Sequence, residues 1–311
     1  MKKTLLFFIC ALFLPLSSAL ALEFSVPGHV SQGHAFPVSV RDNAPFAAVF
    51  HWRGEALNVK AVKMAGEKRW QAEILLAIPL DAAKDQILSI TLPEEQHDFI
   101  ISPRKVKWHE SLLKVEPKYV QPPPEAMKQI ERDRKRSRKA LASRTEKRWK
   151  LPIARPVPGG ITSAFGGRRV FNGQPRAPHK GTDMRCAEGT KVKAACAGTV
   201  LFAESTYFGG NTVYVDHGQG VISTYSHLSA FDVKAGDSVR KGQIIGRSGS
   251  TGRVTGPHLH FGFLVQGVAV DAMPLLSSPP VFTGGPSRSI FDQKPKTGKP
   301  RSTHEKERTR F

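Results

Sequence analysis

The stretch GPHLHF at Gly256–Phe261 places two histidines on either side of a leucine. In a β-strand, side chains two residues apart project from the same face. Both imidazoles therefore lie on one side of the predicted strand, and Leu259 packs into a core on the other. A second stretch, PHKGTD at Pro178–Asp183, adds an imidazole and a carboxylate. Its glycine and prolines disfavour a helix, so we expect a turn that leads into a strand.

Another histidine stands between these two stretches, in YSHL at Tyr225–Leu228. Imidazole nitrogen and carboxylate oxygen are ordinary ligands of a catalytic zinc, which keeps three protein ligands and one open position. Further histidines beside such a metal can handle protons. Each stretch alone is a weak signal, but together they predict a hydrolytic metal centre. Its candidate residues are His179, Asp183, His227, His258 and His260.

The region around these residues is rich in glycine and in short runs of β-forming residues. Residues 197–203, 211–215 and 220–225 are expected to be strands, and glycine-containing turns separate them. No long helical pattern occurs between Gly159 and Leu276. The sequence therefore predicts an antiparallel β domain.

The preceding part of the chain alternates apolar and polar residues between Leu22 and Val115. Turn signals such as Pro27-Gly28 and Arg53-Gly54 recur at short intervals, which is typical of a small β-sandwich. Its histidines are scattered and form no catalytic group. We interpret it as a separate domain without catalytic residues.

A basic connector follows, beginning with prolines at Pro117 and Pro122–Pro124. Residues 125–150 read as a charged helix with eleven Lys and Arg against four Asp and Glu. A helix that is polar on most faces buries little, so we expect a solvated spacer. An electrostatic contact with an anionic wall or membrane is an added possibility. The polar, basic end of the chain is predicted to be disordered.

The first residues have the pattern of a secretory signal peptide. Lys2 and Lys3 precede an apolar core at residues 5–16, and Ala19–Ala21 matches a small-residue cleavage site. The core is too short to favour an uncleaved membrane anchor. We therefore predict cleavage after Ala21 and export to the periplasm or cell envelope, or into the medium.

These patterns divide the chain into five predicted parts. They are a signal peptide at 1–21, a β-sandwich domain at 22–115, a Pro-rich and basic helical linker at 116–158, an antiparallel β domain with the candidate metal centre at 159–276, and a disordered basic tail at 277–311. The fold class is mainly all-β.

Two cysteines remain after the predicted cleavage, Cys186 and Cys196. An even pair in a chain bound for an oxidising compartment predicts a disulfide. The alternative, two zinc thiolates, is less favoured because a complete ligand set exists elsewhere.

The formal net charge of the chain is +20. For an exported protein, a polyanionic envelope surface is a natural partner, reached through the basic linker and tail. Nucleic acid is the competing partner. The sequence contains no helix-turn-helix, zinc-finger or RNA-binding signature, so we expect no nucleic acid.

The C-terminal domain resembles the lysostaphin-type zinc endopeptidases, also called the LytM family. The resemblance covers 159–276 and rests on the three histidine motifs in order, together with a glycine framework. That framework comprises GTKV at Gly189–Val192, GDSV at Gly236–Val239, KGQ at Lys241–Gln243 and TGP at Thr255–Pro257. The chain departs from the family at Ala272, where proline is common.

The resemblance implies a function and a role for each site residue. His179, Asp183 and His260 would bind one Zn²⁺ per chain, and His227 and His258 would be the catalytic histidines. Which of these two is the base and which stabilises the oxyanion stays open. The substrate would be the peptide stems or cross-bridges of bacterial peptidoglycan.

Two further residues are candidates for the substrate groove. Asn172 lies close in sequence to His179, and Tyr225 lies beside the second motif, although Tyr225 could equally fill the core. Arg168 and Arg169 are expected to be solvated.

Two other function classes are compatible with parts of the sequence. A non-catalytic wall-binding or hydrolase-regulating module on the same scaffold would lack metal ligands, whereas this chain retains them all. A lipoyl- or biotinyl-type carrier would share the glycine-punctuated hairpin at Val233–Gly242. That hairpin has no lysine tip motif, and a carrier leaves the metal-type residues without a role.

Overall fold

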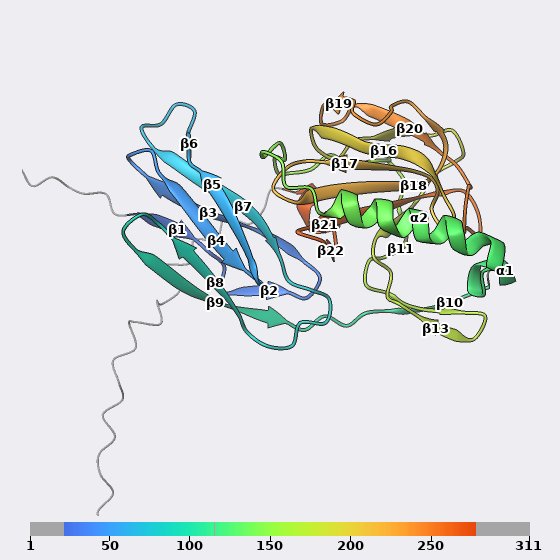
Figure 1. Cartoon of the computed structure of the whole chain (residues 1–311). Coiled ribbons are helices and arrows are strands. Elements are labelled where there is room, and N and C mark those ends of the chain that lie inside the picture. Colours follow the sequence, from blue (N-terminus) through green and yellow to red (C-terminus); the bar gives the residue numbers. More distant parts are fainter. Residues whose placement is uncertain (1–21, 115, 278–311) are drawn as a thin grey trace, which may run out of the picture.

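The structure is a computed structural model that describes residues 22–114 and 116–277. Figure 1 shows two β-rich bodies side by side, an N-terminal sandwich and a C-terminal domain crossed by a helix. The predicted fold class is confirmed. The predicted signal peptide and nearly all of the predicted tail lie outside the described residues.

The sandwich consists of two sheets. The first has the strand order β1 (Glu23–Ser25), β3 (Ala35–Asp42), β7 (Trp70–Ala77) and β6 (Val62–Lys63). The second has the order β2 (His29–Ser31), β9 (Gln96–Arg104), β8 (Gln86–Thr91), β4 (Ala47–Trp52) and β5 (Glu55–Lys60). Strand β4 shows the reason for this arrangement, because Ala48, Phe50 and Trp52 are buried and alternate with more accessible residues.

The C-terminal domain is built on one sheet of ten strands. Its main path has the order β11 (Ile161–Ser163), β14 (Thr182–Arg185), β21 (His258–Val265), β18 (Val221–Phe231), β17 (Gly210–Asp216), β16 (Gly198–Thr206) and β19 (Ser238–Val239). Three more strands pair off this path: β15 (Lys191–Lys193), β20 (Ile244–Ser248) and β22 (Val268–Val270). Neighbours in the sheet are antiparallel, as the sequence predicted.

A small side sheet connects the two domains near the histidine motifs. It pairs β10 (Glu110–Leu113) in parallel with β12 (Arg168–Phe171), which in turn pairs with β13 (Gln174–Arg176). The chain that leaves the sandwich therefore supports a hairpin of the C-terminal domain before it reaches the linker.

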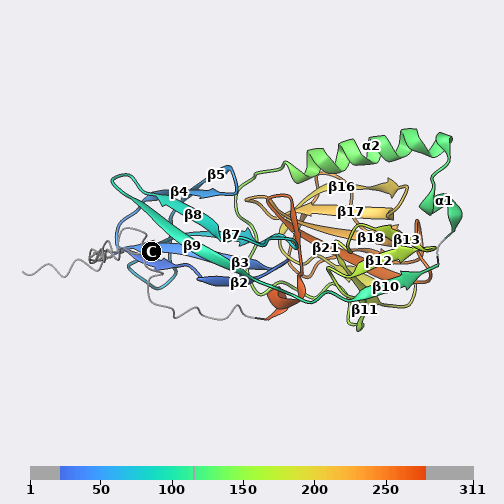
Figure 2. The ribbon, with the colours of Figure 1, turned by 90° about the horizontal axis from the view of Figure 1, so that it is seen from below.

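The linker begins with α1 (Pro117–Val120) and continues as α2 (Pro124–Leu141), which ends nine residues before the predicted Lys150. Figure 2 shows α2 lying along the C-terminal sheet beside β16. The helix buries Ala126, Ile130 and Ala140, so the expectation of a solvated spacer was wrong. The few apolar residues of this charged helix lie on the face that meets the sheet, and this sparse stripe is enough to dock it.

The segment after α2 is also part of the core. Trp149 is 2% exposed and packs with residues of the C-terminal domain. The amide N–H groups of Arg148 and Trp149 both donate to the carbonyl of His217, at 2.7 and 3.0 Å. The last turn of the described chain is a short 3₁₀ helix, Met273–Leu276.

The sandwich and the C-terminal domain share a packed interface. Leu75 and Ala77 of β7 belong to the same buried cluster as Trp149. Around it, the guanidinium of Arg144 makes a two-point contact with the carboxylate of Glu55, with the Nη2–Oε1 distance at 2.9 Å. The two domains are therefore held by apolar burial with charged pairs at its edge.

The predicted disulfide between Cys186 and Cys196 is not formed in the structure, where both are free thiols. Cys196 is buried and its Sγ lies 3.8 Å from the carbonyl oxygen of Lys150, whereas Cys186 Sγ lies 3.5 Å from that of Met184. The two sulfurs thus contact different segments. Burial raises the pKa of the Cys196 thiol, which keeps it protonated and unreactive.

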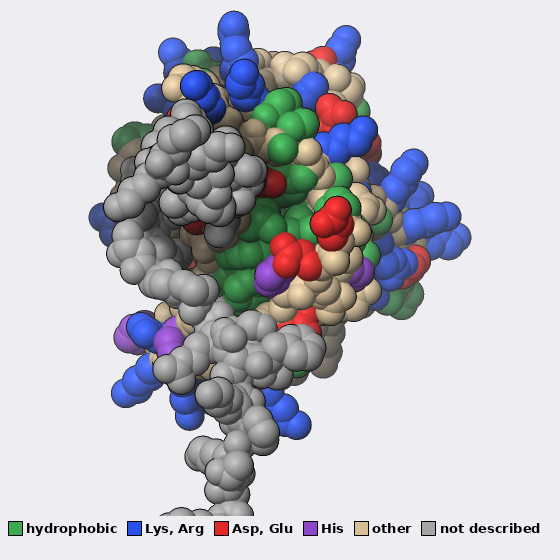
Figure 3. Space-filling model, turned by 90° about the vertical axis from the view of Figure 1, so that its left-hand side faces the viewer, with side chains coloured by type: hydrophobic (Ala, Val, Ile, Leu, Met, Phe, Trp, Pro, Cys, Tyr) green, Lys and Arg blue, Asp and Glu red, His purple; other side chains and the backbone are tan. Residues whose placement is uncertain are grey.

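The surface reflects the high positive charge. On the sandwich end of the molecule, Lys and Arg side chains lie around the rim and apolar side chains gather at the centre (Figure 3). In the part of the chain that the structure describes, no helix has the length and apolar character needed to cross a bilayer.

A buried hydrogen-bonded chain makes the C-terminal fold sensitive to acid. His217, which follows β17, is fully buried; its Nδ1 lies 2.8 Å from the carbonyl oxygen of Ala197 and its Nε2 lies 2.7 Å from Ser223 Oγ. Burial lowers the pKa of His217 to about 4, and neither the Ala197 carbonyl nor the charge of Asp216 offsets this.

We predict that acid destabilises the fold through His217. Because its folded pKa lies below the ordinary value near 6.5, its contribution to stability is lost as pH falls from about 6.5 towards 4. Between pH 7 and pH 5 this amounts to about 2 kcal/mol of unfolding free energy. Urea unfolding at both pH values measures it. The His217→Gln protein should show a smaller difference between the two pH values; an unchanged difference would exclude His217 as the source.

Candidate metal centre

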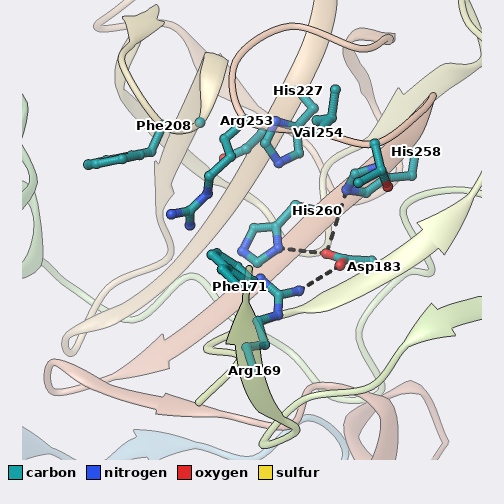
Figure 4. Close-up of a pocket in the computed structure, with 12 residues that line it drawn as sticks. Arg169, Phe171, Asp183, Phe208, His227, Arg253, Val254, His258 and His260 are labelled. Carbon is teal, nitrogen blue, oxygen red and sulfur yellow. Dashed lines mark hydrogen bonds and ion pairs between the residues drawn. The ribbon is translucent and has the colours of Figure 1, made fainter. Parts of the chain in front are cut away.

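Strand pairing brings the predicted site residues together from three parts of the sequence. Asp183 on β14 lies directly opposite His260 on β21, and Ser226 on β18 lies opposite the same histidine on its other side. His227 follows Ser226, so it borders the same place. Figure 4 shows these side chains converging on one cavity.

Three groups converge closely enough to share one ion. The possible ligand atoms of His179, Asp183 and His260 all lie within 4.8 Å of one another. His260 Nδ1 lies 2.8 Å from Asp183 Oδ1 and 3.0 Å from His179 Nε2, and the latter two atoms are 3.1 Å apart. Two imidazole nitrogens and one carboxylate oxygen are a suitable donor set for a catalytic transition metal.

Backbone contacts orient His179 for this task. Its Nδ1 lies 3.0 Å from the carbonyl oxygen of Ala164 and 3.1 Å from Ser163 Oγ. A carbonyl can only accept, so Nδ1 carries the proton and the lone pair of Nε2 points to the centre. Burial lowers the pKa of His179, which keeps the ring neutral and able to bind a metal.

Gly181 permits this close arrangement. A Cβ at this position would lie 2.7 Å from the imidazole of His260 and equally close to the carbonyl of Phe261. Any side chain would therefore push β14 away from β21, so the glycine is needed where the metal ligands meet.

The carboxylate of Asp183 is held at both oxygens. Oδ1 faces the two imidazoles, while Oδ2 lies 2.8 Å from the Nη2 of Arg169 on β12. Burial would raise the pKa of Asp183, but the hydrogen bonds from His179 and His260 outweigh this and hold it well below its ordinary value. The group is thus an anion with one oxygen directed at the candidate metal position.

The two remaining histidines flank this position without joining the cluster of three. The Nδ1 atoms of His227 and His258 lie 2.8 Å from the carbonyl oxygens of Thr251 and Gly256, respectively. Each ring therefore turns its Nε2 away from the backbone, and that of His258 lies 3.8 Å from Asp183 Oδ1. The two ring centres are 4.9 Å apart.

His227 adopts an unusual backbone conformation, with a φ of 66°. It lies within a β-bulge, where Ser226 and His227 of β18 together face Thr212 of β17, and its amide N–H donates to the carbonyl of Gly209. The bulge re-aims the imidazole into the cavity. Burial, reinforced by the nearby His260, lowers the pKa of His227 to about 3, so the ring is neutral at physiological pH.

The cavity over these groups has a volume of about 200 Å³. Beside the predicted residues it is lined by Arg169, Phe171, Phe208, Arg253, Val254 and Thr255. The sequence interpretation missed these residues, and it expected Arg169 to be solvated, although that side chain is only 15% exposed. The position of Arg169 shortly before the first ligand motif was the available signal for a role in the site. Its ion pair with Asp183, however, depends on the fold.

The two candidate groove residues are not part of this cavity. Tyr225 is fully buried, packs against Phe261, and accepts a hydrogen bond from the amide N–H of Ala195 at 2.7 Å. It belongs to the core because successive side chains of a strand point to opposite faces, and the next residue of β18, Ser226, lines the cavity. Asn172 is exposed at the turn of the β12–β13 hairpin and does not line the cavity.

Residues 177–272 match a protein-family model that is described as peptidase family M23. A crystal structure from Pseudomonas aeruginosa that is assigned to peptidase M23 has 30% sequence identity and a TM-score of 0.61, and the match covers 80% of this chain and 95% of that one. The chain belongs to peptidase family M23. As an M23 metallopeptidase, it has the expected place for its metal at His179, Asp183 and His260.

Curated relatives match part of this chain. Peptidoglycan DD-endopeptidase ShyA of Vibrio cholerae is 44% identical over 125 residues, which is 39% of this chain and 29% of the relative. Lysostaphin of Staphylococcus staphylolyticus is 46% identical over 106 residues, which is 32% of this chain and 22% of the relative. The chain thus spans less than a third of the length of either relative.

We predict that Arg169 sets the metal affinity of this M23 peptidase without touching the metal. In Arg169→Gln, Asp183 loses the partner that orients it, so the dissociation constant of the bound metal should rise about 10- to 100-fold. Competition with a chelator measures this. The matched control is Arg168→Gln, which removes the same charge from an exposed position on β12. Equal affinities of the two variants would contradict the assignment.

Proposed function

We propose that this chain is an exported, zinc-dependent endopeptidase that cleaves the peptide stems or cross-bridges of bacterial peptidoglycan. The observation that carries the proposal is the convergence of three possible ligand atoms within 4.8 Å, beside the imidazoles of His227 and His258 in one cavity. This arrangement suits hydrolysis, because a metal and proton-handling groups border the same space.

Zinc fits the donor set best. Two imidazoles and one carboxylate match the three-ligand pattern of catalytic zinc sites, and no thiolate is needed, in keeping with the distant free cysteines. The ion would lower the pKa of a bound water and polarise the scissile carbonyl. The carboxylate of Asp183, fixed by Arg169, and the tautomer of His179, fixed by Ala164, prepare the protein side of this site.

His227 and His258 are the proposed catalytic residues. Each donates its Nδ1 proton to a backbone carbonyl, which leaves Nε2 available as an acceptor towards the substrate. A neutral imidazole can take the proton of the attacking water, and its protonated form can stabilise the developing oxyanion or protonate the leaving amine. Burial lowers the pKa of His227 to about 3, so its charged form is disfavoured in the free protein.

The substrate proposal follows from the relatives. ShyA and ShyC of Vibrio cholerae are described as peptidoglycan DD-endopeptidases, and they are 44% and 46% identical to this chain over 125 and 110 residues. Export by a signal peptide at residues 1–21 would place this chain in the periplasm or cell envelope, where that substrate occurs.

The linker helix supports a second part of the proposal, contact with an anionic envelope surface. Although α2 docks on the sheet, its outer face keeps exposed cations at Arg132, Arg134, Lys135, Arg138 and Lys139. Such a row attracts polyanions at low ionic strength.

The proposal predicts a clear division between two histidines of the same strand. His260→Ala should lose bound zinc and activity, because it removes a ligand. His258→Ala should keep zinc while its activity falls about 10²- to 10⁴-fold, because it removes only proton handling. Metal content is measured by elemental analysis, and activity by mass spectrometry of fragments from purified peptidoglycan.

His29→Ala, which changes an exposed histidine of the sandwich, serves as the control and should match the parent in both measurements. Loss of zinc from His258→Ala would reverse the assigned roles. Intact peptidoglycan after treatment with the zinc-loaded parent protein would refute the proposed substrate.

A further inference from the structure

A second cavity adjoins the metal centre and has a volume of about 340 Å³. It shares Arg169, Phe171, Arg253 and His260 with the first cavity and adds Arg176 and Lys180. Because the two cavities have these walls in common, a peptide bound over the metal can extend directly from one into the other.

The lining of this second cavity is basic. Arg169, Arg176, Lys180 and Arg253 all border it, and the described residues that line it include neither Asp nor Glu. Asp183, in the neighbouring cavity, compensates the charge of Arg169. Arg176 and Lys180 add positive charge to a partly enclosed space, where a charge interaction is stronger than in open water.

Two arginines in this cavity also keep polar atoms without partners. The Nε atoms of Arg169 and Arg176 are buried, and neither has a hydrogen-bond partner among the described residues. Other atoms of the same groups are satisfied, since Arg176 Nη2 lies 2.9 Å from the carbonyl oxygen of Val120. A buried donor without an acceptor is costly, so these N–H groups would gain from an acceptor supplied by a ligand.

Two aromatic side chains contact the guanidinium of Arg253, which lines both cavities. The guanidinium carbon of Arg253 lies 4.9 Å from the ring centre of Phe171 and 4.8 Å from that of Phe208. Figure 4 shows Arg253 reaching from its loop towards these two rings, beside His260. Such cation–π contacts position the guanidinium where the two cavities meet.

We propose that the second cavity binds a carboxylate of the peptide substrate, so that the enzyme selects acidic peptides over neutral ones. This rests on the proposed peptidase function and adds its substrate class. A carboxylate offers several acceptor positions and matches the forked donors of arginine. Since both cavities share His260, the recognised carboxylate belongs to a residue close to the bond that is cleaved.

The experiment compares two synthetic cross-linked peptides that differ only in charge. One carries free carboxylates beside the scissile bond, and in the other the same groups are carboxamides. At low ionic strength the parent enzyme should cleave the acidic peptide with a kcat/KM about 10- to 100-fold higher. The preference should shrink in 0.5 M salt, because salt screens partly exposed charges.

Variants locate this preference in the second cavity. Arg176→Gln and Lys180→Gln should each lower kcat/KM for the acidic peptide severalfold while changing the amidated peptide little, and Arg176→Lys should retain most of the preference. The control Lys191→Gln removes the same charge from an exposed position on β15 outside both cavities and should behave as the parent. Metal content is measured for every variant, so that a loss of the metal is not mistaken for a loss of recognition.

The outcomes separate the two proposals. Equal cleavage of both peptides by the parent, or an undiminished preference in Arg176→Gln and Lys180→Gln, overturns the carboxylate site while the peptidase function stands. Cleavage of neither peptide by the zinc-loaded parent contradicts the proposed peptidase function itself.

Discussion

The carboxylate of Asp183 is the group on which the site depends. One of its oxygens meets the imidazoles of His179 and His260, and the other is bound by Arg169. A buried anion is stable only when its surroundings compensate it, and here four structural elements supply that compensation. The pairing of β14 with β21, the turn at Gly181 and the β12 strand must therefore all be in place before the site can exist.

This requirement explains the parts of the fold that lie outside the ten-stranded sheet. Arg169 is carried by β12, and β12 is paired with β10, a strand of the segment that leaves the sandwich. The N-terminal half of the chain thus contributes a structural support to the candidate centre, although none of its side chains lines the cavity. The linker also contributes to the C-terminal domain, because Trp149 belongs to its core cluster and the apolar stripe of α2 packs on its sheet beside β16.

The charge of the chain has two distinct placements in the structure. Much of it lies outside, on the surface of α2 and on the rim of the sandwich, where it can act over a long range and is weakened by salt. A smaller part is turned inward around the second cavity, with Arg253 held between two phenylalanines. Basic residues that look equivalent in a count of composition therefore have different surroundings: some are exposed to solvent, and others line a cavity beside the candidate metal centre.

The sequence by itself determined the local chemistry of this protein. The His-Leu-His strand, the turn containing Gly181 and the alternation of the sandwich strands were all readable, because period-two patterning and residue type are local properties. The tertiary structure alone decided what depends on distant segments meeting: the ion pair of Arg169 and the burial of Tyr225. It also separated the two cysteines and docked a helix that looked solvated. Neither patterning nor composition encodes which faces will meet, since that choice follows from packing of the whole chain.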